Sequence, residues 1–155
     1  MPWAYFDEAT QEHDCGGGAI LHIFPHHSYN MLLGFRRGTN KFAELSVAKF
    51  LIQFALEKNC RDIQLFGDSK IVCDWFNRTS RCSTYTLSHI RDETLRLISL
   101  FDSFTCKHIF RERNTAADSL SKEAANRESG IWLIRELCDG EHYQYYHQPF
   151  MDIID

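Results

Sequence analysis

The strongest constraint on the fold comes from the segment between Lys41 and Lys58. Polar residues recur there every three or four positions, as they do along one side of an α-helix, and nearly all other positions are apolar. The residues of this polar stripe are Ser46, Lys49, Gln53 and Glu57. A helix with so narrow a stripe must bury most of its surface against other elements. A chain of 155 residues can supply them within one domain, without disulfides or structural metal.

Short apolar runs separated by turn residues precede this helix, and strands alternate with helices after it. The predicted strands span residues 3–7, 19–24, 31–37, 62–66 and 104–110, with Gly16–Gly18 as a flexible entry to the second. The predicted helices span residues 41–58, 69–76, 87–102, 115–127 and 130–138. This order predicts an α/β fold with a five-stranded mixed sheet (three antiparallel strands, then two parallel) and helices on both faces. We expect residues 1–127 to form this domain and residues 128–155 to form a C-terminal extension, with a helix and an acidic, aromatic tail.

The composition excludes several classes of protein. No apolar stretch reaches the ~18 residues that span a membrane, and the N-terminus lacks the pattern of a secretory signal. The six cysteines are scattered and no Cys/His set has zinc-ligand spacing, which favours reduced thiols and an intracellular location, cytoplasmic or nuclear. We expect a monomer that does not associate with membranes. The net charge of −4 argues against a protein that coats nucleic acid, whose signature is a basic face.

Glu44 lies on the wrong side of the predicted helix for an exposed carboxylate. At about 100° per residue it is about 160° from Ser46, on the side of Ala48 and Ala55. A buried carboxylate needs a partner, because burying an unpaired charge costs several kcal/mol. A buried ion pair or hydrogen bond would satisfy Glu44, and so would a bound cation.

Three aspartates stand at element boundaries where acids could converge. Asp7 ends the first predicted strand, Asp68 follows the fourth through one glycine, and Asp118 lies in the first turn of a later helix. Each has a structural alternative: a turn for Asp7, a helix cap for Asp68, and a capping box with Thr115 for Asp118. If neighbouring strand ends and a packed helix brought these acids and Glu44 together, their repulsion would require divalent cations, and magnesium suits such ligands. The residues alone leave both interpretations open.

Four segments that carry these acids resemble the type 1 ribonuclease H family, and more closely its plant-type, reverse-transcriptase-like branch. They are WAYFDEA (3–9), TNKFAEL (39–45), IQLFGDSKIV (63–72) and HIFRERNTAADSLSK (108–122). Their order and separations agree with the organisation of strands and helices in the family. The resemblance covers residues 3–126.

The resemblance implies an RNase H-like fold and a metal-dependent endonuclease that hydrolyses the RNA strand of RNA/DNA hybrids, leaving a 5′-phosphate and a 3′-hydroxyl. It implies two Mg²⁺ ions, with Mn²⁺ able to substitute. Asp7 would lie between both metals. Glu44 and Asp68 would complete the site near the leaving 3′ oxygen, and Asp118 would hold the metal that activates the attacking water.

The same resemblance places substrate contacts beside the acids. Asn40 matches a family position that contacts nucleic acid. Lys41 departs from the family, which often has a second asparagine there, but a lysine could still serve as a phosphate contact. Ser69 is a further binding candidate, with helix capping as the alternative. Arg111 and Arg113 lie in a short connection where many cellular members carry a mobile histidine, and we expect these arginines to handle substrate or product.

Three departures from the family pattern bear on activity. Glu8 stands where the family usually has glycine, His108 falls within the fifth predicted strand and not in a loop, and residues 77–85 are too few for a basic helical protrusion. These departures keep an alternative open: a catalytically weak or inactive module that acts through protein or nucleic-acid binding. Residues 128–155 would then be a site for a protein partner.

The acidity of the chain is concentrated near its C-terminus. Residues 136–155 contain five acidic residues and no lysine or arginine, so they carry −5 and residues 1–135 carry +1. Four acids of residues 1–135 are the proposed metal ligands. The net charge therefore does not argue against a nucleic-acid substrate.

Overall fold

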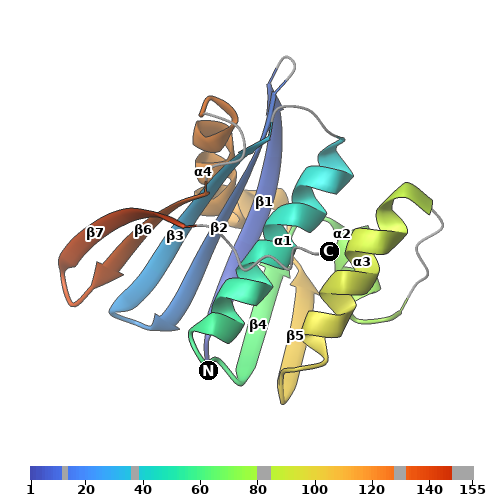
Figure 1. Ribbon diagram of the computed structural model, residues 1–155, viewed down its shortest axis with the longest axis horizontal. Helices are drawn as coiled ribbons and strands as arrows, with labels where there is room; N and C mark the ends of the chain where they lie inside the picture. Colours follow the sequence, from blue (N-terminus) through green and yellow to red (C-terminus); the bar gives the residue numbers. More distant parts are fainter. Residues whose placement is uncertain (12–13, 36–38, 80–84, 128–131, 148–155) are drawn as a thin grey trace.

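The computed structural model describes residues 1–11, 14–35, 39–79, 85–127 and 132–147. Its strands are β1 (Trp3–Gln11), β2 (Asp14–Phe24), β3 (His27–Phe35), β4 (Asp62–Gly67), β5 (Ser103–His108), β6 (Trp132–Cys138) and β7 (Glu141–His147). Its helices are α1 (Asn40–Glu57), α2 (Lys70–Phe76), α3 (Tyr85–Ile98), α4 (Thr115–Ala125) and a short 3-10 helix, η1 (Arg111–Arg113). Helices α1, α2 and α3 lie on one face of the sheet and α4 lies on the other (Figure 1).

The described strands form one mixed sheet in the order β5-β4-β1-β2-β3-β6-β7. β1, β4 and β5 run parallel, and the other neighbouring pairs are antiparallel. The predicted meander, the two parallel strands and the helices on both faces are therefore confirmed. The edge strand β5 is further held by Asn77, whose side chain donates to the Cys106 carbonyl (2.7 Å) and accepts from the Cys106 N–H (3.2 Å).

The sheet has two strands more than predicted, and the predicted helix over residues 130–138 is wrong. Residues 130 and 131 lie outside the described residues, and the rest of that segment is β6, which pairs with β3. The two-residue turn Asp139-Gly140 leads into β7, with φ values of 52° and 84°. Positive φ at both positions is typical of a type I′ hairpin turn, for which Asp-Gly is a strong signal. The end of the predicted acidic tail, 148–155, also lies outside the described residues.

The glycines at positions 16–18 belong to β2 and are not a flexible entry to it. α4 crosses this part of the strand so closely that a Cβ atom on Gly18 would lie 2.5 Å from the Ser121 N and 2.7 Å from the Ala117 O. A Cβ atom on Gly16 would also collide with the backbone of α4. The glycine run therefore allows the backbones of helix and sheet to approach each other.

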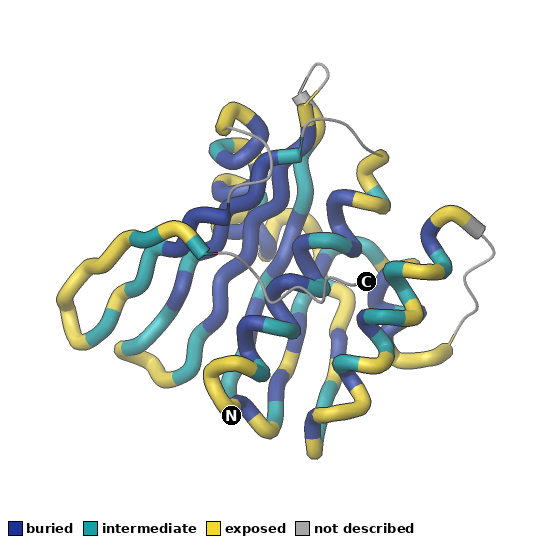
Figure 2. The backbone as a smooth tube through the Cα atoms, in the orientation of Figure 1, coloured by how far each residue is buried: buried dark blue, intermediate teal, exposed yellow. Residues whose placement is uncertain are grey.

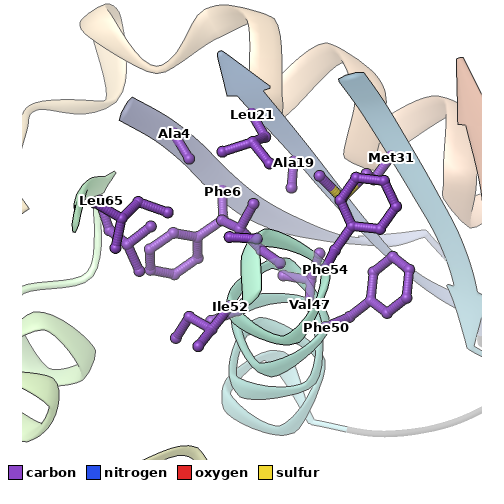
Figure 3. Close-up of a cluster of buried hydrophobic side chains, with 14 of the residues drawn as sticks. Ala4, Phe6, Ala19, Leu21, Met31, Val47, Phe50, Ile52, Phe54 and Leu65 are labelled. Carbon is purple, nitrogen blue, oxygen red and sulfur yellow. The ribbon is translucent and has the colours of Figure 1, made fainter. Parts of the chain in front are cut away.

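The main core lies between α1 and the sheet (Figure 3). Phe6 of β1 and Phe54 of α1 are fully buried, and Phe50 stacks on Trp132 of β6 with ring centroids 3.5 Å apart. Trp75 of α2 is buried in the same core. Burial of one such large side chain contributes about 1.5–3 kcal/mol.

Burial is concentrated in α1 and the central strands, whereas the β6–β7 hairpin and parts of β4 and β5 are more exposed (Figure 2). On the face opposite α1, α4 packs mainly against β1, β2 and β3. In the described part of the chain, no helix combines the length and the apolar character that crossing a membrane requires.

Candidate active site

The sheet topology brings two of the predicted acids together. β1 and β4 run parallel and pair as far as Phe6 and Gly67, so the next residues, Asp7 and Asp68, emerge side by side. The prediction that Asp7 ends its strand is wrong, because β1 continues to Gln11 along β2. Glu44 joins them from α1, which packs on β1 and β2.

The three carboxylates converge on one point. One oxygen from each of Asp7, Glu44 and Asp68 lies within 4.8 Å of the other two. Asp7 is 3% exposed, Glu44 is 2% exposed and Asp68 is half-buried. Lys41 Nζ is 3.7 Å from Glu44 Oε1, and Arg111 Nε is 3.9 Å from Asp68 Oδ2. The alternative of a buried ion pair thus accounts for one oxygen of Glu44, while its Oε2 has no hydrogen-bond partner among the described residues.

Burial and mutual repulsion oppose ionisation of these acids in the metal-free protein. Burial, together with the charges of Asp68 and Asp118, raises the pKa of Asp7 from 3.8 to about 8. Burial also raises the pKa of Glu44 from 4.5 to about 7, against the opposing effect of the Lys41 ammonium. Divalent cations relieve such repulsion and take carboxylate oxygens as ligands. The cluster is therefore consistent with a divalent metal site.

Asp118 lies at the edge of this triad. Its carboxyl is close enough to Asp7 to raise the pKa of that residue through a hydrogen bond and through its charge. It is not one of the three acids that meet within 4.8 Å, and it forms an ion pair with Lys122 (3.0 Å). The capping-box alternative for Asp118 is wrong, because the N-cap of α4 is Asn114 and no side chain caps this helix.

Asn114 is a residue of the site that the sequence does not single out. Its buried side chain donates a hydrogen bond from Nδ2 to the carbonyl of Phe6, which precedes Asp7 (3.0 Å). This bond ties the start of the helix that carries Asp118 to the strand that carries Asp7. The signal in the sequence, an asparagine before a helix, is equally typical of an ordinary N-cap.

The predicted substrate contacts of α1 and α2 lie beside the acids. Asn40 accepts a hydrogen bond from the Thr10 hydroxyl of β1. Lys41 Nζ donates to Ser69 Oγ (2.9 Å). Ser69 also caps α2 by accepting from the Val72 N–H (3.4 Å), so the capping alternative for this residue is confirmed.

η1 presents two arginines to solvent next to the acids. Arg111 faces Asp68, whereas Arg113 makes no ion pair with any residue that the structure describes. His108 lies in β5 and not in a loop, as predicted, although the strand ends at this residue. Glu8 reaches the same region: burial and the charge of Asp68 raise its pKa, and its Oε2 has no hydrogen-bond partner within the described ranges. The site thus has one acid more than the four predicted ligands.

The metal-free protein is expected to lose stability as the pH rises from about 4 to about 8. Asp7 ionises at about 8 in the folded state and at 3.8 in the unfolded state, so the folded state binds more protons across this range and the free energy of unfolding falls. We expect the melting temperature in EDTA to be lower at about pH 8 than at about pH 5, by at least about 4 °C. Circular dichroism measures it. Mg²⁺ should restore the loss, and equal melting temperatures in EDTA would contradict the raised pKa.

Comparison with known proteins supports this description of the fold and the site. A profile of the reverse transcriptase-like family matches residues 18–124, a range that contains Glu44, Asp68 and Asp118 but not Asp7. Curated protein sequences give no significant match. The solved RNase H1 of the halophilic archaeon Halobacterium salinarum is 26% identical, with a TM-score of 0.70 over 79% of this chain and 96% of that chain.

Two further structures show the same fold at lower identity. The N-terminal RNase H domain of a Mycobacterium tuberculosis protein is 19% identical, with a TM-score of 0.73 over 81% of this chain and 93% of that chain. LC11-RNase H1, isolated from compost and solved in complex with an RNA/DNA hybrid, is 17% identical, with a TM-score of 0.69 over 81% of this chain and 97% of that chain. The Asp7–Glu44–Asp68 triad resembles an RNase H active site. Because the family profile covers more than half of its length, the chain belongs to the reverse transcriptase-like family and has the mixed α/β fold of RNase H.

Proposed function

We propose that this protein is a metal-dependent endonuclease that hydrolyses the RNA strand of RNA/DNA hybrids and leaves a 5′-phosphate and a 3′-hydroxyl. The observation that carries the proposal is the environment of Glu44. This buried carboxylate has no hydrogen-bond partner at Oε2 among the described residues and lies within 4.8 Å of oxygens of Asp7 and Asp68. A structural ion pair needs one acid and one base, whereas three converging acids need a cation. The hybrid bound by LC11-RNase H1 supports the choice of substrate.

Two Mg²⁺ ions are the cofactors that we propose, with Mn²⁺ able to substitute. Both ions prefer oxygen ligands, which is what the cluster offers. Asp7 is adjacent to Asp68 and to Asp118, so it would hold both ions. Glu44 and Asp68 would be further ligands of the ion near the leaving 3′ oxygen. Asp118 would be a further ligand of the ion near the attacking water. When bound, such ions neutralise charge at the phosphate and supply a nucleophilic water.

The residues around the acids would position the hybrid. Lys41 and Arg111 form the ion pairs with the triad described above, so they stand where a phosphate would approach. Ser69 holds the Lys41 ammonium through its hydroxyl and would orient it. Asn40 and Arg113, both exposed, would complete the contact surface.

Cleavage assays on end-labelled substrates test the proposal. The full chain is incubated with RNA/DNA hybrid, double-stranded RNA or double-stranded DNA, in Mg²⁺, Mn²⁺ or EDTA. We expect cleavage of the RNA strand of the hybrid in either metal and none in EDTA, with products that carry a phosphatase-sensitive 5′ end. Cleavage of double-stranded RNA in place of the hybrid, or no cleavage of the hybrid in either metal, would overturn the proposal.

A second candidate function is a weakly active module that acts through protein or nucleic-acid binding. Glu8 beside the triad favours it, as does the β6–β7 hairpin. β7 is an edge strand of the described sheet with Tyr143 and Tyr146 exposed, and an exposed edge can pair with another chain. We propose that the chain is a monomer whose residues 128–155 dock a protein partner.

Replacing Glu8 with glutamine is expected to improve hybrid binding. The substitution removes one negative charge where a phosphate approaches, worth about 1 kcal/mol in water, so KM should fall about fivefold with kcat little changed. The gain should shrink as salt screens the charge. Steady-state kinetics in low and high salt measure it, with the exposed Asp102→Asn as the control. A higher KM for Glu8→Gln would mean that Glu8 assists metal or substrate binding.

A further inference from the structure

A pocket of about 440 Å³ lies where the C-terminal ends of β4 and β5 meet Tyr5 of β1, and its residues Tyr5 and Phe66 each stand two positions before an acid of the triad. Among its lining residues are Tyr5, Phe66, Lys107, Phe110 and Arg113. Its volume lies within the range of about 300–1,000 Å³ that is usual for ligand sites. None of the four proposed metal ligands lines it, so the pocket is separate from the metal site.

The floor of the pocket is a row of side chains across three strands. Tyr5 of β1 is opposite Phe66 of β4, which is opposite Lys107 of β5. Phe6 and Leu65, the sequence neighbours of the two aromatic residues, are buried in the core beneath α1, so strand alternation places Tyr5 and Phe66 on the other face. The two rings stack with centroids 5.1 Å apart. On this face α4 packs mainly against β1, β2 and β3, so it leaves β4 and β5 largely uncovered.

An exposed ring and two cations stand at the rim of this pocket. Phe110 is 71% exposed, which is high for so large an apolar side chain. Lys107 and Arg113 are exposed, and neither forms an ion pair with a residue in the described ranges. Glu112 is the only acid between Ser103 and Arg113. Aromatic faces flanked by cations hold unpaired nucleic acid, because bases stack on the rings and phosphates contact the cations.

One hydrogen bond and one pair of consecutive residues connect the pocket to the candidate active site. The Ile109 N–H donates to the carbonyl of Gly67, which precedes Asp68 (2.9 Å). Arg113, at the rim, precedes the Asn114 that ties α4 to β1. The pocket thus lies next to the candidate active site, through β4 on one side and through the start of α4 on the other.

We propose that this pocket binds unpaired RNA that continues from the strand in the active site. Bases would stack on Phe110 and on the Tyr5–Phe66 pair, and phosphates would contact Lys107 and Arg113. The choice of RNA as the occupant rests on the proposed function. Binding itself requires neither metal nor cleavage.

Fluorescence anisotropy with a labelled oligouridine tests the proposal on the full chain in EDTA. Phe110→Ala is expected to raise Kd at least about fivefold, because one stacked base is lost. Lys107→Gln is expected to lower the slope of log K against log salt by about 0.7, the value for one phosphate contact on a single strand. The matched controls are Phe24→Ala and Arg96→Gln, which change exposed side chains elsewhere, and neither should alter binding. Melting temperatures verify that each variant is folded.

The cleavage assay separates this proposal from the proposed function. Suppose that the hybrid is not cleaved, but the oligouridine binds and Phe110→Ala weakens this binding. The proposed function is then wrong and the pocket proposal is supported. If the hybrid is cleaved but Phe110→Ala and Lys107→Gln bind the oligouridine as tightly as their controls do, the pocket proposal is overturned. A wild-type chain that does not bind the oligouridine overturns it as well.

Discussion

Replacing Asp7 with asparagine is expected to lower kcat/KM for hybrid cleavage by about 1000-fold or more, as happens when one preorganised electrostatic group at a reaction centre is lost. Asp7 is the acid adjacent to both Asp68 and Asp118, so the neutral amide would weaken both proposed metal positions. Initial rates in Mg²⁺ over a range of hybrid concentrations measure the loss. Raising the Mg²⁺ concentration should recover only part of it, because the amide is a poorer ligand than the carboxylate.

The same substitution is expected to stabilise the metal-free protein. At about pH 8 the wild-type chain holds a partly ionised, buried carboxylate among other acids, and asparagine has nearly the same shape without the charge. Its side-chain oxygen can still accept the bond from the Glu8 N–H (2.9 Å). We expect a melting temperature in EDTA at least about 4 °C higher. The exposed Asp102→Asn should change neither stability nor activity. An Asp7→Asn variant that is less stable but fully active would contradict the metal site.

Replacing Gly18 with valine is expected to cost about 3 kcal/mol or more of the free energy of unfolding. The new Cβ atom would lie 2.5 Å from the Ser121 N and 2.7 Å from the Ala117 O, both backbone atoms of α4 that cannot move without the helix. Because α4 also carries Asp118, we expect the molecules that remain folded to cleave the hybrid more slowly. Urea unfolding followed by circular dichroism measures the first effect, and the assay under native conditions measures the second.

Gly140→Ala is the matched control for this glycine effect. Gly140 has φ of 84° in the β6–β7 turn, and no atom would lie within 4 Å of an added Cβ. Alanine there should cost about 1 kcal/mol through backbone strain, with cleavage unchanged. Equal losses of stability in the two variants would mean that chain flexibility, and not the packing of α4, is the reason for the glycine at position 18.

The sequence identifies the acids as candidates, Glu44 because of its side of the helix and the three aspartates because they stand at element boundaries. Glu44 opposes the polar stripe of its helix, and the structure shows it buried. Asp7 and Asp68 follow residues that pair in parallel strands, so their proximity follows once the order of these strands is known. The position of Asp118 depends on a different contact, the bond from Asn114 to β1, which no periodicity reveals.

The errors have equally specific causes. The segment 130–138 has apolar residues that fit a helix, but Trp132 and Ile134 pack in the main core while Leu133 packs in the smaller cluster beneath α4, as the alternation of a strand requires. The Asp139-Gly140 turn was the local signal for a hairpin. A glycine run has the same sequence pattern in a loop and on a surface for close helix packing, so the sequence predicts flexibility at residues 16–18 where the structure has a strand packed against α4.

The sequence by itself determined the order of the main helices and strands and identified the carboxylates that need an unusual environment. The spacing of apolar residues and the presence of a charge among them can both be recognised within a short segment of the sequence. Only the tertiary structure decided that Asp7, Glu44 and Asp68 meet within 4.8 Å, that β6 extends the sheet at β3, and that an aromatic and basic pocket adjoins the triad. The physical reason is that distances between residues far apart in the chain depend on strand order and on how closely helices pack on the sheet, and both are set by the whole fold at once.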